Sequence, residues 1–119
     1  MNSYAPEIFA SGTLKSINET TIYVVPRHSR VTLSALSLIN SGSASITVNV
    51  AIKEPGSASR SIIPKNQILH AGDMVQVTAP HSIPAQGSLV LAASTPGVLE
   101  YTFSGIKLPS IPVPTDRAQ

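Results

Sequence analysis

Histidines and carboxylates are the side chains best suited to chemistry in this sequence, and their spacing does not form a site. His28, His70 and His81 are the three histidines, and no pair has the H-x-H or H-x-x-x-H spacing typical of metal ligands. Asp73 follows His70 by three residues across a predicted turn, where local hydrogen bonding explains the pair better than a metal site does. The pattern therefore predicts no metal centre.

The other common catalytic patterns are also missing from the sequence. Serines are frequent, but none stands in a G-x-S-x-G nucleophile elbow. The six acidic residues are far apart, and neither a glycine-rich phosphate loop nor a D-x-D calcium cluster occurs. Without cysteine, disulfides and thiolate sites are excluded. We expect a protein that is not an enzyme and has no cofactor, metal or small-molecule substrate.

The low charge content is the most informative feature of the composition. Asp, Glu, Lys and Arg make up 12% of the residues, about half of the usual share of roughly 25%. The net charge of +2 comes from scattered residues, and there is no Trp, so nucleic-acid binding is not expected. A surface with so few charges suggests that neighbouring subunits cover much of it. The alternative is an ordinary extracellular-style β domain with a Ser/Thr surface.

Neither a targeting signal nor a membrane segment is visible. The first residues, MNSYAPEIFASG, lack the basic region and apolar core of a signal peptide. No apolar run approaches the ~18–20 residues that a membrane span requires. We expect synthesis in a cytoplasm and no membrane partner.

The stretch 31–53 is predicted to be the centre of the core. Its second half alternates, with Ile46, Val48, Val50 and Ile52 on one face, which is typical of a strand with one buried side. Its first half changes phase near Ala35, which suggests a β-bulge. We expect the two halves to form a hairpin around the turn at residues 40–43.

The remaining chain favours an all-β fold. Short alternating or β-branched segments are separated by turn signals every 8–12 residues, and none has helical periodicity. About eight short strands of this kind predict an antiparallel β-sandwich, either jelly-roll or Ig-like. We expect an N-terminal arm at 1–6, one sandwich domain at 7–106, with its first strand interrupted at Ser11-Gly12, and a Pro-rich C-terminal extension at 107–119.

Three segments are candidates for an interface. Residues 20–25 (TTIYVV) have no polar face in their second half, so a second subunit is expected to cover the side that does not face the core. Residues 27–30 concentrate positive charge, either as a solvated loop or as a dock for an acidic patch. The extension 107–119 is either a frayed terminus or an arm laid over a neighbouring subunit. The predicted interface residues are Ile22, Tyr23, Val24, Val25, Arg27, Arg30, Pro109, Ile111 and Val113.

The order of these motifs resembles a known class of proteins. The motifs are, in chain order, Tyr23-Val24-Val25-Pro26, Leu38-Ile39-Asn40, the alternating Thr47–Ile52, Leu69 with Gly72-Asp73, Ile83–Gly87, and a closing strand that ends in Ser104-Gly105. Over about residues 13–106 this arrangement is similar to small β-sandwich virion proteins of tailed bacteriophages.

The resemblance implies a structural role in a virion. It implies a capsid cement or decoration protein that binds the major capsid protein on the capsid surface. It also implies a homo-oligomer, with a trimer favoured, and synthesis in the host cytoplasm. The alternative is a tail, baseplate or fibre component that contacts a host glycan.

Overall fold

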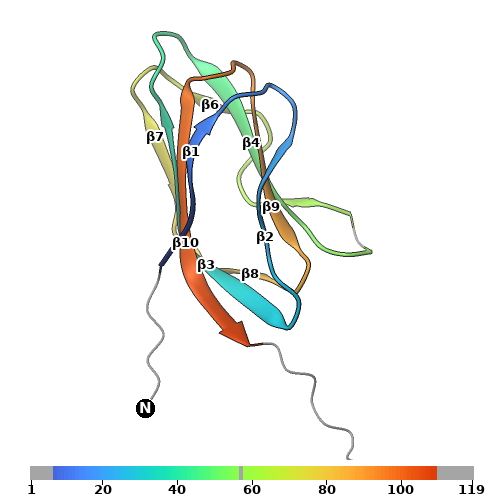
Figure 1. Cartoon of the computed structure of the whole chain (residues 1–119). Helices are drawn as coiled ribbons and strands as arrows, with labels where there is room; N and C mark the ends of the chain where they lie inside the picture. Colours follow the sequence, from blue (N-terminus) through green and yellow to red (C-terminus); the bar gives the residue numbers. More distant parts are fainter. Residues whose placement is uncertain (1–6, 57, 110–119) are drawn as a thin grey trace, which may run out of the picture.

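The computed structural model describes residues 7–56 and 58–109, and all of its regular structure is β-strand (Figure 1). In this part of the chain, two five-stranded antiparallel sheets pack face to face. The prediction of an all-β sandwich is confirmed. Described from the N-terminus, the strands are β1 (Glu7–Leu14), β2 (Thr20–Val24), β3 (Ser29–Asn40), β4 (Ile46–Lys53), β5 (Arg60–Ser61), β6 (Gln67–Leu69), β7 (Met74–Val77), β8 (His81–Ile83), β9 (Ser88–Ala93) and β10 (Leu99–Pro109).

The strand pairing is nested in the manner of a jelly roll. The first sheet has the order β1-β10-β3-β7, and β8 also pairs with β3; we call it the β3 sheet. The second has the order β2-β9-β4-β5, and β6 also pairs with β4; we call it the β4 sheet. We count β5 with β6 as one interrupted strand and β7 with β8 as another, which gives eight strands. The first strand then pairs with the eighth, the second with the seventh, the third with the sixth and the fourth with the fifth. This topology selects the jelly roll over the Ig-like alternative.

The expected hairpin between residues 31–40 and 46–53 is wrong. β3 and β4 lie in different sheets, and each is an interior strand of its own sheet. The period-two pattern shows which face of a strand is buried, but it does not show which strand lies beside it. Two long strands with fully apolar inner faces can face each other across a core as readily as they can pair.

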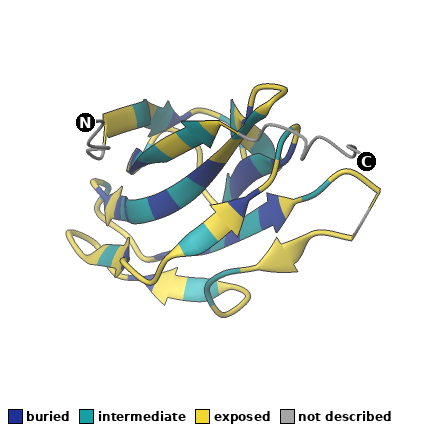
Figure 2. Ribbon diagram, turned by 90° about the horizontal axis from the view of Figure 1, so that it is seen from below, coloured by how far each residue is buried: buried dark blue, intermediate teal, exposed yellow. Residues whose placement is uncertain are grey.

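The prediction that these two strands centre the core is confirmed. Their inner faces are buried, and Phe103 and strand β9 complete the apolar layer. Figure 2 shows buried positions within the strands, in dark blue, and exposed positions in the loops and outer strands, in yellow. The phase change in β3 is also real, because the β10 ladder passes from Ala35 directly to Leu33 and leaves Ser34 as a bulge. The inward residues of the two strands are Val31, Leu33, Leu36, Leu38, Ile46, Val48, Val50 and Ile52.

Asn40 ends β3, and its hydrogen bonds stabilise the turn by which the chain passes from the β3 sheet to the β4 sheet. Its buried side-chain amide donates to the carbonyl oxygens of Ala44 at 2.8 Å and Leu69 at 3.0 Å, and its Oδ1 accepts from the Gly42 N–H at 2.9 Å. Its backbone bonds to the turn at Gly72 and Asp73. Every polar atom of this buried side-chain amide has a hydrogen-bond partner, so Asn40 stabilises the turn that follows β3.

Two strand boundaries differ from those expected. β1 continues through Ser11-Gly12 without interruption, because Gly12 is extended in the strand and does not turn the chain. β10 continues through Pro109, so Lys107–Pro109 belong to the β3 sheet and not to an extension that begins at Lys107. The expected arm at 1–6 and the remainder of the extension lie outside the described residues.

Each outer edge strand of the described sheets carries an irregularity. β1 has a bulge at Phe9 and β2 has one at Ile22. On the opposite edges, the segment with Pro64 separates β5 from β6, and the segment with Pro80 separates β7 from β8. Bulges and prolines of this kind prevent edge strands from adding further strands. No helix that could cross a membrane occurs in the described residues.

Candidate interface at one end of the sandwich

The described residues contain no cluster of three or more His, Asp or Glu side chains that could hold a metal ion. His70 and Asp73 are joined locally, since the Asp73 N–H donates to the His70 carbonyl oxygen at 3.0 Å. The His70 ring lies 2.9 Å from the hydroxyl of Ser45. His70 and Asp73 therefore act as turn and surface groups.

The predicted residues 22–25, at the end of β2 and directly after it, divide between the core and the surface. Val25 is 1% exposed and lies in the core, where its backbone N–H donates to Gly87 at 2.8 Å and its carbonyl accepts from Gln86 at 2.9 Å. Val24 lies on the outer face and is 56% exposed. Of these two, only Val24 has a side chain that a partner could reach. Ile22 forms the bulge and packs against the core.

Tyr23 belongs to an aromatic cluster that closes the side of the sandwich between β1 and β2. The ring centroids of Phe9 and Tyr23 are 5.1 Å apart, and both rings contact Phe103, at 5.5 Å and 5.7 Å. Burial raises the pKa of Tyr23 above its ordinary value, and the nearby charge of Glu7 raises it further. The cluster joins two sheets whose edge strands do not hydrogen-bond to each other. Tyr23 therefore has a structural role.

The start of β3 pairs with the end of β10 and with β8 at one end of the sandwich, which we call the β8 end (Figure 1). Arg27 and Arg30 are exposed in and after the turn from β2 to β3. In the ladder between β10 and β3, Leu108 lies opposite Arg30 and Pro109 lies opposite Ser29. The structure thus brings the basic turn beside the last residues of β10. Ile111 and Val113 lie outside the described residues.

Lys107 lies in the segment 107–119 that was predicted as a candidate interface, but it was not among the residues named for it. It is exposed and lies opposite Val31 on β3, one residue before Leu108, which pairs with Arg30; the side chains of Lys107 and Arg30 point to opposite faces of the sheet. It was assigned to a proline-rich extension because Pro109, Pro112 and Pro114 dominate the pattern there. The alternation of Ile106 and Leu108 around Lys107 was the available signal for a strand.

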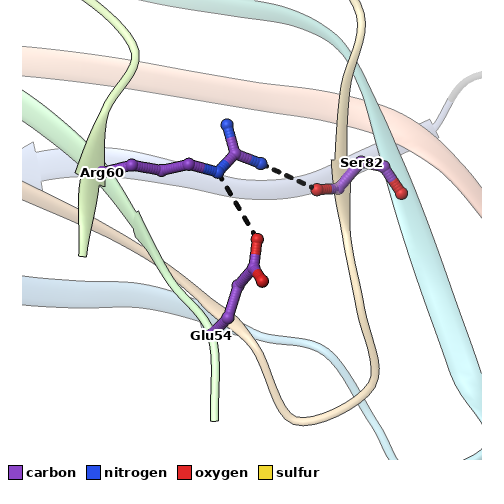
Figure 3. Close-up of polar contacts among 3 residues, drawn as sticks. All are labelled: Glu54, Arg60 and Ser82. Carbon is purple, nitrogen blue, oxygen red and sulfur yellow. Dashed lines mark hydrogen bonds and ion pairs between the residues drawn. The ribbon is translucent and has the colours of Figure 1, made fainter. Parts of the chain in front are cut away.

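A polar bridge joins the two sheets at the same end (Figure 3). Arg60 on β5 pairs with Glu54 at 3.4 Å through Nε and donates to the carbonyl oxygen of Ser82 on β8 at 3.3 Å. β5 belongs to the β4 sheet and β8 to the β3 sheet, so this arginine spans the opening between them. Its charge is partly neutralised by Glu54, whereas Arg27, Arg30 and Lys107 have no ion pair within the described part of the chain.

Several large apolar side chains are exposed on the outer surface. Ile39 and Met74 lie opposite each other on β3 and β7, and they are 37% and 56% exposed. Ile68 on β6 lies opposite Thr47 and is 56% exposed. Of Ile39, Met74 and Ile68, only Ile39 could be recognised as exposed from the sequence, because it breaks the alternation at the end of β3. The exposed large hydrophobic residues are Ile8, Ile17, Val24, Ile39, Ile68 and Met74.

Comparison with known proteins leaves the class of this protein open. No family model matches the chain, and no curated protein matches it. One solved structure that it resembles is the Drosophila NLP-core, described as providing insight into pentamer formation and histone binding. The two share 18% identity with a TM-score of 0.48, over 86% of this chain and 99% of that chain. A likeness this distant assigns neither a function nor an assembly.

Proposed function

We propose that this chain is a non-enzymatic structural protein of a tailed-phage virion, a capsid cement or decoration protein that bridges subunits of the major capsid protein. The observation that supports it most is the combination of a charge-poor surface with large apolar side chains exposed on both sheets, at Val24, Ile39, Ile68 and Met74. Apolar exposure of this kind favours a protein that completes its burial in an assembly.

The fold is compatible with this role without proving it. Jelly rolls form viral capsid domains as well as lectins and enzymes, so topology alone does not choose among them. Within the described residues, the absence of a metal-binding cluster adds no support for a catalytic alternative. We propose that copies associate as a trimer and that the β8 end and the exposed strand faces contact the capsid shell.

A cement protein stabilises a shell by adding contacts between its subunits. A specific interface buries on the order of 1,600 Å² in total, and the symmetry of a capsid repeats it many times. Such repetition turns a modest affinity into firm retention against the pressure of packaged DNA.

A tail, baseplate or fibre protein that binds a host glycan is the second candidate, and the tyrosines give it little support. Tyr23 and Tyr101 pack against the core instead of forming an exposed stacking platform. Tyr4 lies outside the described residues. We therefore keep the capsid role as the proposal.

The test is the composition and stability of purified virions from the phage that encodes the chain. Quantitative mass spectrometry of the particles is expected to find the chain in a fixed ratio to the major capsid protein. Particles made without it are expected to release DNA at a lower temperature. A chain that is absent from the particles, or present only in isolated tails, would contradict the proposal.

A further inference from the structure

The last residues of β10 form an edge unlike the others in the described sheets. The ladder between β10 and β3 is regular from Gly105 to Pro109, without a bulge. On its other side, β10 pairs with β1 only as far as Gly105, which lies opposite Glu7. Within the described residues, the backbone of Ile106–Pro109 therefore has a partner on one side only. The bulges and prolines that protect the other edges are absent along Ile106–Leu108.

The side chains along this edge alternate. Ile106 and Leu108 lie on the face of Thr32 and Arg30, and both are half-buried. Lys107 lies on the other face, opposite Val31, and it is exposed. A strand placed beside β10 would put its own residues directly opposite these three and on the same faces. The complementary segment therefore has an acidic residue between two apolar residues.

The charges around the edge favour an acidic partner. Arg30 is on the neighbouring strand, on the face opposite to that of Lys107, and Arg27 is in the turn before it; both are exposed. The flanking residues of β3 and β8 are uncharged apart from Arg30 and the histidine His81. Among the described acids, Glu7 lies opposite Gly105, at the point where the paired part of the edge ends, and Glu54 at the β8 end is paired with Arg60.

The same charges disfavour a second copy of this edge as the occupant. Two β10 edges paired about a twofold axis would bring Lys107 of one copy close to Lys107 of the other, and like charges across a strand pair are destabilising. The chain's own N-terminal residues, MNSYAP, contain no acid and end in Pro6, which has no N–H to donate.

We propose that the β10 edge at Ile106–Pro109 binds an extended acidic segment of a partner protein, with apolar and acidic residues in alternation, as an added β-strand. Main-chain hydrogen bonds would supply affinity, and the contact with Lys107 would supply selectivity. The edge can bind such a strand whether or not the chain assembles on a capsid, so the two proposals can fail separately.

The experiment uses the full chain and two labelled peptides, Thr-Val-Glu-Val-Glu-Val-Thr and its counterpart with lysine in place of glutamate. Fluorescence anisotropy is expected to show binding of the acidic peptide that weakens with salt, and little binding of the basic one. Lys107→Glu is expected to lower the affinity for the acidic peptide about fivefold or more. The matched control Lys65→Glu makes the same charge change at an exposed site next to β6 and is expected to leave binding unchanged.

Amide chemical shifts locate the bound peptide. Changes are expected to concentrate at Ile106, Lys107, Leu108 and Arg30. Equal binding of the two peptides, equal losses in the two variants, or shifts centred on another strand would overturn the proposal. Binding that appears only after residues 1–6 are removed would also overturn it, because the edge would then belong to the chain's own N-terminus.

Discussion

Ile39 on β3 and Met74 on β7 face each other across a strand pair on the outer face of the β3 sheet, where both remain exposed. Their neighbours in the ladder are Ser37 and Gln76, so the apolar pair is bordered by polar side chains. An exposed cross-strand pair of this kind adds little to the stability of a monomer, and its burial in an assembly is favourable.

Met74→Lys is expected to weaken self-association, because a charge would have to be buried in a contact made by this face. Sedimentation velocity measures the distribution of oligomers over a range of concentrations. The free energy of unfolding is expected to change by less than about 0.5 kcal/mol, as for most exposed substitutions. Met74→Leu, which keeps the apolar side chain, is the control. An unchanged distribution in Met74→Lys would show that this face is not the contact.

Asn40→Ala is expected to destabilise the fold by about 2–4 kcal/mol, because three hydrogen bonds are lost and buried backbone groups are left without partners. Urea denaturation measures the change. Ser41→Ala removes one exposed hydrogen bond, to the carbonyl oxygen of Val98, and is the matched control, with an expected cost of about 0.5–1 kcal/mol. Equal effects of the two variants would contradict the special role of Asn40.

Gly105→Ala is expected to cost about 1–3 kcal/mol or more, because the added Cβ would lie 2.5 Å from the backbone carbonyl oxygen of Thr32 and 3.1 Å from the ring of Phe9. A backbone atom in a paired strand cannot move aside cheaply. Thermal unfolding measures the loss. Gly56→Ala is the comparison: its Cβ would meet no neighbour, although its φ of 74° makes the substitution mildly strained. A neutral Gly105→Ala would contradict the close approach of β10 and β3.

The raised pKa of Tyr23 predicts that the folded state loses stability in alkaline solution. Burial, followed by the charge of Glu7, raises its pKa in the folded state above the ordinary 10.0. The folded state therefore holds the phenol proton more tightly than the unfolded chain does. This contribution is fully present below pH 10.0 and is lost as the pH rises through the raised pKa.

Tyr23→Phe is expected to reduce that alkaline loss of stability, which denaturation at a series of pH values measures. Absorbance titration of tyrosinate follows the same group directly. Glu7→Gln is expected to lower the pKa of Tyr23 part of the way, because burial, the larger cause, remains. A Tyr23 that titrates at its ordinary pKa would contradict its place in the aromatic cluster.

The layers of the fold were predictable from the sequence, and the neighbours of each strand were not. The alternation of Ile46, Val48, Val50 and Ile52 identified a buried face, and the phase change near Ala35 identified a real bulge. The pairing of β3 with β10 and of β4 with β9 depends on contacts between distant segments, which local patterns do not contain. A tight turn between two long strands was therefore mistaken for a hairpin.

The exposure of the predicted interface residues could be inferred from the sequence only in part. Val24, Arg27 and Arg30 are exposed at the β8 end, as a contact surface requires, whereas Val25 is in the core. An unbroken apolar run does not show which of its members face inward, and the bulge at Ile22 changes the order within β2. The place of Lys107 opposite Val31 could not be inferred, because it exists only through the register of β10 against β3.

The pairing of β1 with β10 has a consequence for synthesis on the ribosome. β1 is the first of the described strands to be made and β10 is the last, so β1 gains its hydrogen-bonding neighbour only after all the others have been made. The β3 sheet therefore closes only after β10 has been made, and until then the nascent β1 and β3 expose strand edges to chaperones and to other chains. Truncated products that end before residue 99 lack β10 and are expected to be degraded or to aggregate.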